Sequence, residues 1–188
     1  MILATIRSLL TESLRKLYAA ENQIAWALPK ILEGVSSQEL KVVVQEYLAE
    51  TERHRERFGA MGKSLSETLT DSRCLIAEAF TREALSLAER RGDNRVLDLA
   101  LMAVLRQMVH FEKSTYEIAR SVAEVCGERT VVDVVDEILS ETEHTERSFI
   151  LLTEDMMDSI SATLPEEGPP AMRTYVEGSD TAGRRVRH

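Results

Sequence analysis

The chain has 188 residues and a formal net charge of −9, from 23 Lys and Arg against 32 Asp and Glu. This length suits one domain with a substantial core. The acidic balance argues against non-specific binding to nucleic acid or to an anionic membrane, because both need a basic surface. Two cysteines, Cys74 and Cys126, are too few for a disulfide framework and lack zinc-site spacing. With neither a signal peptide nor a membrane-spanning apolar run, the sequence predicts a cytoplasmic protein.

Apolar residues recur at helical spacing along almost the whole chain, and strand patterns are nearly absent. The first helix is predicted over about residues 3–33, with Gly34 placed to end it. Residues 36–39 read as a capping box that opens a second long helix. That helix continues to a polar connection over residues 64–72.

The second half of the chain repeats this organisation after a shorter helix at about residues 73–90. A third long helix begins near Asp93 and closes at Gly127. The fourth starts within residues 130–133 and runs to about Thr163, where prolines stop it.

Residues 1–163 therefore predict an all-α four-helix bundle with an additional short helix in the crossover. Residues 164–188, which contain Gly, Ser and Arg, predict a disordered C-terminal tail.

Each long helix carries one glutamate on its apolar stripe: Glu21, Glu50, Glu112 and Glu141. Glu21 and Glu50 are 29 positions apart, as are Glu112 and Glu141, and the two pairs are offset by 91 positions. The tripeptide Glu-Thr-Glu begins at both Glu50 and Glu141. A buried, unpaired carboxylate is costly, so four that converge need a partner cation. Inward-facing glutamates from four helices are how a bundle holds a di-iron or di-manganese centre.

Such a centre takes a single Glu from two helices and a Glu-x-x-His from each of the other two. Glu141 and His144 have that spacing on the fourth helix. Glu21 and Glu112 fit the single-glutamate role. A lone Glu-x-x-His is common by chance on charged helices, so the hypothesis depends on the conjunction of all four glutamates with the repeat.

The second helix departs from this pattern. Arg53 occupies the position three after Glu50, and His54 follows one residue later. On a helix, the fourth position lies close to the same face as the third, so His54 is either a ligand or a residue that supports one. The predicted site is therefore asymmetric.

Three tyrosines lie three or four residues from a stripe glutamate: Tyr18, Tyr47 and Tyr116. Their spacing favours core aromatics over hydrogen-bond donors to the centre. Tyr18 and Tyr116 are the candidates for the donor role, and no catalytic residue is assigned beyond them.

Six segments carry a resemblance to a known family: Leu17-Tyr-Ala-Ala-Glu-Asn-Gln-Ile24, Ala27-Leu-Pro-Lys30, Glu50-Thr-Glu-Arg-His54, Cys74, Asp98-Leu-Ala-Leu101 and His110-Phe-Glu-Lys-Ser-Thr-Tyr116. Over about residues 3–163 the chain resembles the YciE/YciF family of ferritin-like bacterial proteins. The sequence departs from that family at Val109, where a glutamate is expected, and from the wider superfamily at Arg53.

The resemblance implies a ferritin-like bundle, homodimers, a di-iron centre and an association with bacterial stress responses. A more distant resemblance, to bacterioferritin and rubrerythrin, implies metal ligands at Glu21, Glu50, Glu112, Glu141 and His144. The cofactors expected are two iron ions, and manganese is an alternative that ligand type does not distinguish.

Two functions remain open. The first is a di-metal carboxylate protein that reacts with dioxygen or peroxide, as a ferroxidase or a peroxide-consuming enzyme. The second is a metal-free bundle dimer that acts as a structural or protein-binding module, with its glutamates protonated or paired with Arg53 or Arg106. Iron storage in a shell is disfavoured, because the crossover contains an extra helix.

Overall fold

The computed structural model describes residues 4–70 and 72–162, which form five α-helices and, within those ranges, no strand. The helices are α1 (Ile6–Gly34), α2 (Gln38–Ser64), α3 (Leu75–Ala88), α4 (Asn94–Cys126) and α5 (Arg129–Ser161). The all-α prediction and the predicted order of helices are confirmed, with boundaries within a few residues. The predicted tail, residues 164–188, lies outside the described residues.

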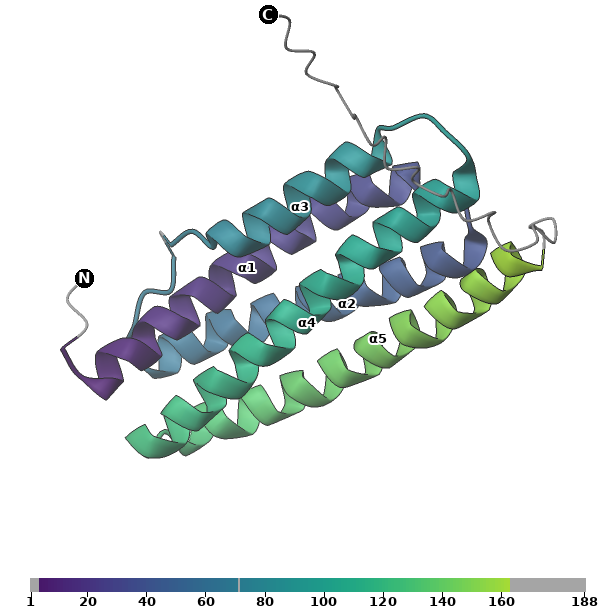
Figure 1. Cartoon of the computed structure of the whole chain (residues 1–188). Helices are drawn as coiled ribbons and strands as arrows, with labels where there is room; N and C mark the ends of the chain where they lie inside the picture. Colours follow the sequence, from purple (N-terminus) through teal and green to yellow (C-terminus); the bar gives the residue numbers. More distant parts are fainter. Residues whose placement is uncertain (1–3, 71, 163–188) are drawn as a thin grey trace, which may run out of the picture.

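The four long helices form a closed ring in which α1 packs on α2, α2 on α5, α5 on α4 and α4 on α1 (Figure 1). Neighbours in this ring run antiparallel. Helix α2 ends at the opposite end of the bundle from the start of α4, so α3 carries the chain back along its length. Helix α3 lies outside the ring and packs on both α1 and α4. None of the helices in the described part of the chain is both long enough and apolar enough to cross a bilayer.

The helix ends follow local capping chemistry. Ser37, rather than the expected Ser36, caps α2, because its Oγ accepts a hydrogen bond from the Leu40 amide at 3.1 Å. The Asp93 carboxylate accepts hydrogen bonds from two amides in the first turn of α4. Gly127, with φ of 72°, ends α4 in the left-handed conformation that glycine adopts without strain.

Asp98 explains one of the segments that carry the family resemblance. Its side chain is buried, and its two oxygens accept hydrogen bonds from the amides of Ser36 at 2.9 Å and Ser37 at 2.7 Å. These amides lie at the start of α2, where backbone N–H groups lack helical partners and the helix dipole favours a negative charge. Asp98 therefore fastens α4 to the α1–α2 connection and has a structural role.

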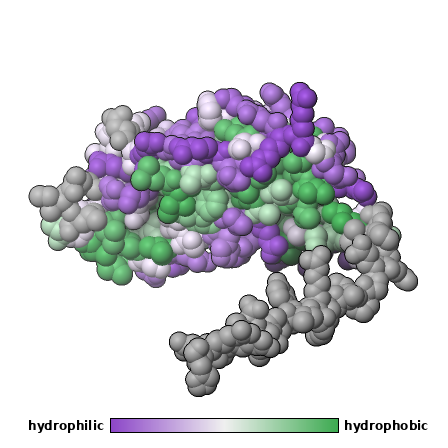
Figure 2. Space-filling view, turned by 45° about the horizontal axis from the view of Figure 1, so that its top comes forward, coloured by the Kyte–Doolittle hydropathy of each residue, from purple (hydrophilic) through white to green (hydrophobic). Residues whose placement is uncertain are grey.

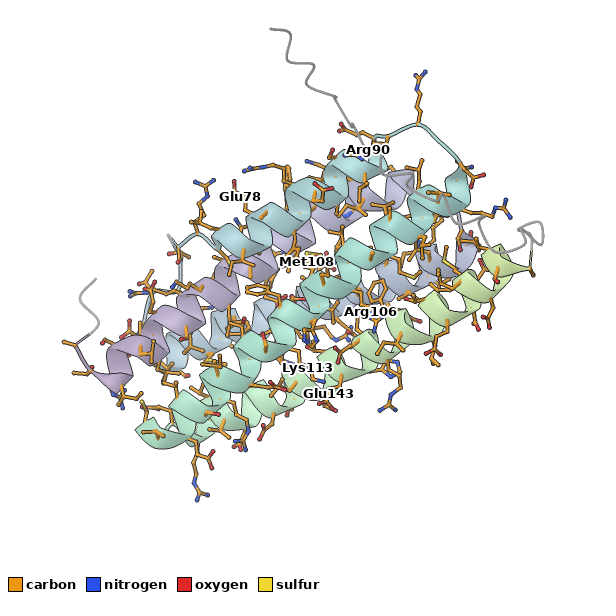
Figure 3. All side chains as sticks on the ribbon, viewed as in Figure 1. Glu78, Arg90, Arg106, Met108, Lys113 and Glu143 are labelled. Carbon is orange, nitrogen blue, oxygen red and sulfur yellow. The ribbon has the colours of Figure 1, made fainter. Side chains whose placement is uncertain are left out.

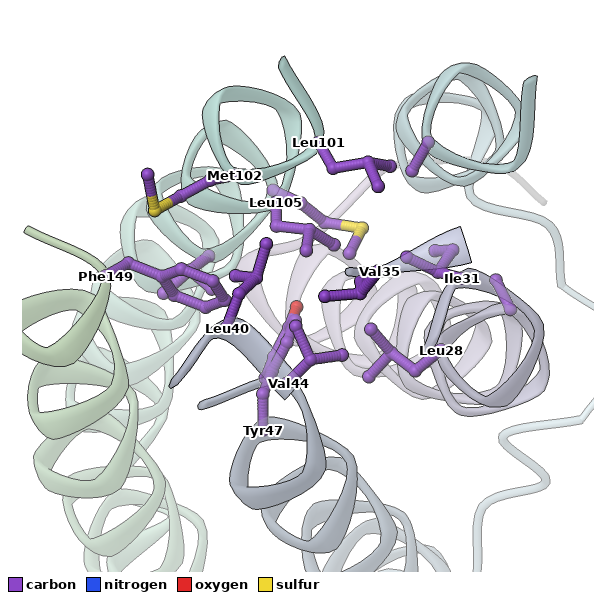
Figure 4. Packing of buried hydrophobic residues seen from close by; sticks show 14 of the residues in the cluster. Leu28, Ile31, Val35, Leu40, Val44, Tyr47, Leu101, Met102, Leu105 and Phe149 are labelled. Carbon is purple, nitrogen blue, oxygen red and sulfur yellow. The ribbon is translucent and has the colours of Figure 1, made fainter. Parts of the chain in front are cut away.

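The hydrophobic core has two large clusters along the bundle, and a smaller third one includes Ala20 of α1 and Ala77 of α3. One large cluster lies near the α1–α2 connection and includes Leu28, Leu105 and Phe149 (Figure 4). The other large cluster lies toward the opposite end and includes Leu14 and Ile138. On every long helix the apolar stripe passes from one cluster to the other. The four glutamates lie between the two large clusters: Glu21, Glu50, Glu112 and Glu141.

Outside the core, ion pairs connect α4 to α5. Lys113 Nζ lies 2.9 Å from Glu146 Oε2 and 3.6 Å from Glu143 Oε1, and Figure 3 shows Lys113 and Glu143 on this side of the bundle. His110 Nδ1 lies 2.9 Å from Glu146 Oε1. Ion pairs near the protein surface each contribute about 1 kcal/mol or less. His110 is thus a surface residue, although it lies only two positions before Glu112.

Gly34 is required by packing rather than by helix termination. It belongs to the last turn of α1, and Val35, which follows, is in an extended conformation. A Cβ atom at position 34 would lie 2.5 Å from the carbonyl oxygen of Ala88 and 2.6 Å from its Cα. These are backbone atoms at the end of α3, so they cannot yield without moving that helix. The glycine therefore allows α3 to lie close against α1.

We expect Gly34→Ala to lower the free energy of unfolding by about 1–3 kcal/mol, because it overpacks a backbone contact. Gly59→Ala is the matched control. It is also helical, but a Cβ there meets nothing within 4 Å. Because alanine is the better helix former, Gly59→Ala should leave stability unchanged or raise it by about 0.5–1 kcal/mol. Urea unfolding followed by circular dichroism measures both changes. Equal effects of the two substitutions would contradict this explanation.

Candidate metal centre

The four stripe glutamates all lie between the two hydrophobic clusters. Glu21 and Glu112 are fully buried, with 0% and 2% of their surface exposed. Glu50 is also buried, at 8%, whereas Glu141 keeps 27% of its side chain exposed. The arrangement is therefore graded, with two carboxyls deep in the bundle and one that reaches its surface.

His54 connects the deep and the outer carboxylates. Its ring is buried, with Nδ1 3.6 Å from Glu21 Oε1 and Nε2 3.0 Å from Glu141 Oε2. Burial lowers the pKa of His54, against the charges of Glu112 and Glu141, which act to raise it. A neutral imidazole between two carboxylates has a nitrogen lone pair that can bind a metal ion.

Two hydroxyl groups hold two of the other carboxylates. The Tyr47 hydroxyl donates a short hydrogen bond to Glu112 Oε2, and the Thr145 hydroxyl donates one to Glu50 Oε2. Tyr47 and Thr145 are themselves buried, on α2 and α5. Each bond therefore crosses between helices and fixes the direction of a carboxylate at the middle of the bundle.

Glu21 has no hydroxyl or amide donor among the residues that the structure describes. Its polar neighbours are His54 and the carboxyl of Glu112. Burial raises the pKa of Glu21 well above its ordinary value, although a hydrogen bond with Glu112 acts to lower it. Burial and the charge of Glu21 likewise raise the pKa of Glu112. Two acceptor atoms that are buried without such a donor are costly, and they mark a position where a cation would be stabilised.

Glu141 has the opposite environment. Burial acts to raise the pKa of Glu141, but the hydrogen bond and charge of Arg57 outweigh it, with help from His54, so the pKa is lowered. Arg57 Nη2 lies 2.8 Å from Glu141 Oε1, and Arg53 Nη2 lies 3.8 Å from Oε2. Glu141 is therefore an ionised carboxylate that already has a cationic partner.

The structure does not bring every predicted site residue to this place. His144 is exposed on α5, and Thr145, the next residue, faces the core instead. Tyr18 lines an outer groove between α1 and α2. Tyr116 does reach the centre. It is fully buried, its ring lies edge-on to His54 at 6.2 Å, and its hydroxyl has no partner within the described ranges.

Position on the apolar stripe was the better guide to these residues than motif spacing. Tyr47 and Thr145 both lie on apolar stripes, although the sequence favours a core role for Tyr47 and indicates no role for Thr145. His54 and Thr145 are 91 positions apart, so they are equivalent in the repeat, as are Arg53 and His144. The inward position is thus the fourth after Glu50 and after Glu141, not the third. The sequence does not predict a role for Arg57, because its spacing along the helix is like that of the neighbouring solvated residues.

These residues have the side-chain types that bind a metal ion, but their rotamers in this structure do not group them around one position. Carboxylates and a neutral imidazole are the ligands that iron and manganese accept, and the two oxygens of Glu21 have no hydroxyl or amide donor among the described residues. As the side chains stand, no three His, Cys, Asp or Glu residues in ranges 4–70 and 72–162 are grouped to hold an ion. Glu50 and Glu141 are directed by Thr145 and Arg57, so they would have to turn.

Comparison with known proteins places the chain in a family. A family model described as a domain of unknown function, DUF892, matches residues 5–161. Protein YciF of Escherichia coli strain K12 is 29% identical over 147 residues, which cover 78% of this chain and 89% of YciF.

Two solved structures have the same fold. The crystal structure of the E. coli stress protein YciF matches with a TM-score of 0.79 and 26% identity, over 83% of this chain and 99% of that one. YcfI from Rhodopseudomonas palustris, provisionally described as a structural protein, matches with a TM-score of 0.74 and 28% identity, over 78% of this chain and 94% of that one. The predicted resemblance is confirmed: the chain belongs to the DUF892 family, a domain of unknown function, and is a homologue of YciF.

Proposed function

We propose that the protein is a di-metal carboxylate protein, with iron or manganese, that reacts with dioxygen or peroxide in protection against stress. The observation that carries this proposal is Glu21, whose two buried oxygens have no hydroxyl, amide or cationic Lys or Arg partner among the described residues and lie next to Glu112 and His54. A divalent cation would neutralise these carboxyls and offset the cost of burying them. The residues that would hold the metal are Glu21, Glu50, His54, Glu112 and Glu141.

The bound metal would supply Lewis acidity and a change of oxidation state. The chain supplies the surroundings. The two hydrophobic clusters exclude water on both sides of the centre. Tyr47 and Thr145 orient Glu112 and Glu50 by donating hydrogen bonds to them. Tyr116 has a buried hydroxyl without a partner in the described residues, so it is available to donate to an oxygen-containing substrate.

The stress role and the compartment are supported less directly. YciF is named a stress protein, and its homology extends that role to this chain as a hypothesis. Both cysteines, Cys74 and Cys126, are free thiols. Free thiols are typical of a reducing compartment, so we propose a cytoplasmic location.

We also propose association as a homodimer. Ile6, Ile118 and Val125 are exposed apolar residues that line a shallow groove between α1 and α4, and apolar patches interrupt the hydrophilic surface in Figure 2. Such patches mark contact surfaces in soluble proteins. Sedimentation equilibrium should give twice the chain mass, and Ile118→Glu should shift the protein toward monomer. A wild-type monomer at all concentrations would contradict this proposal.

A metal-free bundle remains the second candidate, because Glu141 already pairs with Arg57 and Arg53. The description of YcfI as a structural protein points the same way. Arg106, the other arginine expected as a partner, is exposed on the side of α4 that faces α5 (Figure 3), and none of the described contacts joins it to a stripe glutamate. In this candidate the function would lie at a protein-binding surface.

Metal binding separates the two candidates. Anaerobic Fe(II) or Mn(II) should raise the melting temperature. At a metal concentration one hundred times Kd, the free energy of unfolding should increase by about 2.7 kcal/mol. Glu21→Gln and Glu112→Gln should abolish this gain. Glu143→Gln, which changes an exposed glutamate on α5, should retain it. A wild-type protein with no metal-dependent shift would leave the metal-free bundle as the correct function.

Redox chemistry needs its own measurement. Exposure of the Fe(II)-loaded protein to oxygen should produce the ultraviolet absorption of ferric carboxylate. Tyr116→Phe should slow this change by about tenfold, since it removes one hydrogen-bond donor to the substrate. Binding of Fe(II) without any oxidation faster than that of free Fe(II) would limit the function to metal binding.

The raised pKa values of Glu21 and Glu112 predict how stability depends on pH without metal. The folded state binds these protons more tightly than the unfolded chain, in which the pKa of glutamic acid is about 4.3. Their contribution to stability is therefore complete below that pH and is lost as the pH rises through the raised folded values. Glu112→Gln should consequently become more stable than wild type as the pH rises from 5 to 8 in a chelator. Urea unfolding at each pH tests the sign, and a constant difference would refute it.

A further inference from the structure

The centre has an inner and an outer half that differ in how their charge is balanced. In the inner half, Glu21 and Glu112 are fully buried, and neither contacts a Lys or Arg side chain within the described ranges. Arg55 acts on Glu21 only at a distance. In the outer half, Glu141 is in direct contact with Arg57. The inner half therefore lacks a cation, and the outer half already contains one.

Arg57 lies at the outer edge of the centre and is only partly exposed. Its Nη2 is 2.8 Å from Glu141 Oε1, and its Nε is 3.9 Å from Glu137 Oε2. Its Nη1 is buried without a partner among the described residues. Only 27% of the side chain is exposed, compared with 49% for Arg53. An arginine that directs a donor into the protein, instead of into solvent, occupies space beside the carboxylate that it neutralises.

Arginine stays charged at any physiological pH, and its planar fork matches the geometry of a carboxylate. Arg57 therefore neutralises the charge of Glu141, as a metal ion bound to this carboxylate would do. We propose that Arg57 is a tethered cation that occupies the outer half of the centre. A first divalent ion then binds at Glu21, Glu112 and His54. A second ion binds only by displacing Arg57 from Glu141. This inference rests on the proposed metal function.

The repeat supports this asymmetry. The position equivalent to Arg57 in the second half of the chain is Ser148, 91 residues later. Its Oγ donates to the carbonyl oxygen of His144 at 3.2 Å, within its own helix. The other half of the repeat therefore supplies no matching cation. Two halves with similar glutamates would give two similar metal positions, but Arg57 makes them different.

The energetic consequence is a gap between two affinities. A hydrogen bond between charged groups is worth about ten- to a hundredfold in an equilibrium constant. The second ion must break such a bond, whereas the first binds where the Glu21 oxygens have no Lys, Arg or hydroxyl partner among the described residues. The second dissociation constant should therefore exceed the first by about ten- to a hundredfold.

Anaerobic Mn(II) titration measures this gap without any dependence on activity. Calorimetry of the wild type should show one tight ion and a second, weaker one. Electron paramagnetic resonance should show isolated Mn(II) at one equivalent, and a spin-coupled pair only at excess. In Arg57→Gln the second ion should tighten at least about tenfold, and the coupled pair should form at stoichiometric metal.

Control variants separate Arg57 from charge in general. Arg53→Gln removes a more exposed arginine 3.8 Å from the same carboxylate, so its effect on the second ion should be smaller. Arg120→Gln breaks a surface pair with Asp136 and should have none. Arg57→Lys keeps the charge without the fork and should lie between wild type and Arg57→Gln. If Arg57→Gln does not fold by circular dichroism, Arg57→Lys provides the test.

The outcomes distinguish this inference from the proposed function. Two ions of equal affinity in the wild type, or a second affinity that neither Arg57 variant changes, would overturn the role of Arg57 and leave the metal centre in place. If Mn(II) and Fe(II) bind to neither the wild type nor an Arg57 variant, the metal function itself is wrong, and the role of Arg57 falls with it.

Discussion

The protein buries carboxylates inside a helix bundle with too few positive groups to balance them. Glu21 and Glu112 lie at the boundary between the two hydrophobic clusters, where water cannot solvate them. Their raised pKa values express the cost of placing charge there. Apolar residues at the same positions would join the two clusters into one continuous core. Glutamate at these positions therefore lowers the stability of the bundle unless a cation or a proton balances its charge.

The surrounding polar groups partly offset the cost of burying these carboxylates. Tyr47 and Thr145 contribute hydroxyl donors from buried positions, His54 spans from Glu21 to Glu141, and Arg57 neutralises the outermost carboxylate. Each donor comes from a different helix than the glutamate it serves, so the polar centre also fixes how the helices pack. These partners are unevenly distributed. Protein groups neutralise Glu141 in the outer half, whereas Glu21, the deepest carboxyl, has no hydroxyl, Lys or Arg partner among the described residues.

Membership of the DUF892 family fixes the fold but not the chemistry. YciF matches nearly over its full length, and both solved relatives have the same bundle. One is named a stress protein, and the other is described provisionally as structural. The two functions considered for this chain correspond to two states of the same residues. In one, a metal satisfies Glu21; in the other, Glu21 is protonated and Arg57 satisfies Glu141.

The sequence by itself determined the helices, their order and the four glutamates. Helical periodicity is a local property, and a carboxylate on an apolar stripe is visible without knowing what faces it. The duplicated spacing also showed that the glutamates belong to one level of the bundle. Capping residues such as Asp93 and Gly127 were readable for the same reason, since a helix end depends on a few neighbouring residues.

Only the tertiary structure decided which partners meet these glutamates. Whether His54 or His144 faces the core depends on the rotation of α2 and α5 against their neighbours, which motif spacing does not specify. In the sequence, Arg57 resembles the solvated arginines around it. In the folded protein, Glu141 of α5 lies 2.8 Å from its Nη2. Gly34 looked like a helix stop, but its role came from Ala88, 54 positions away in the chain. Contacts between helices are set by packing of whole faces, and that information is not contained in any single stretch of sequence.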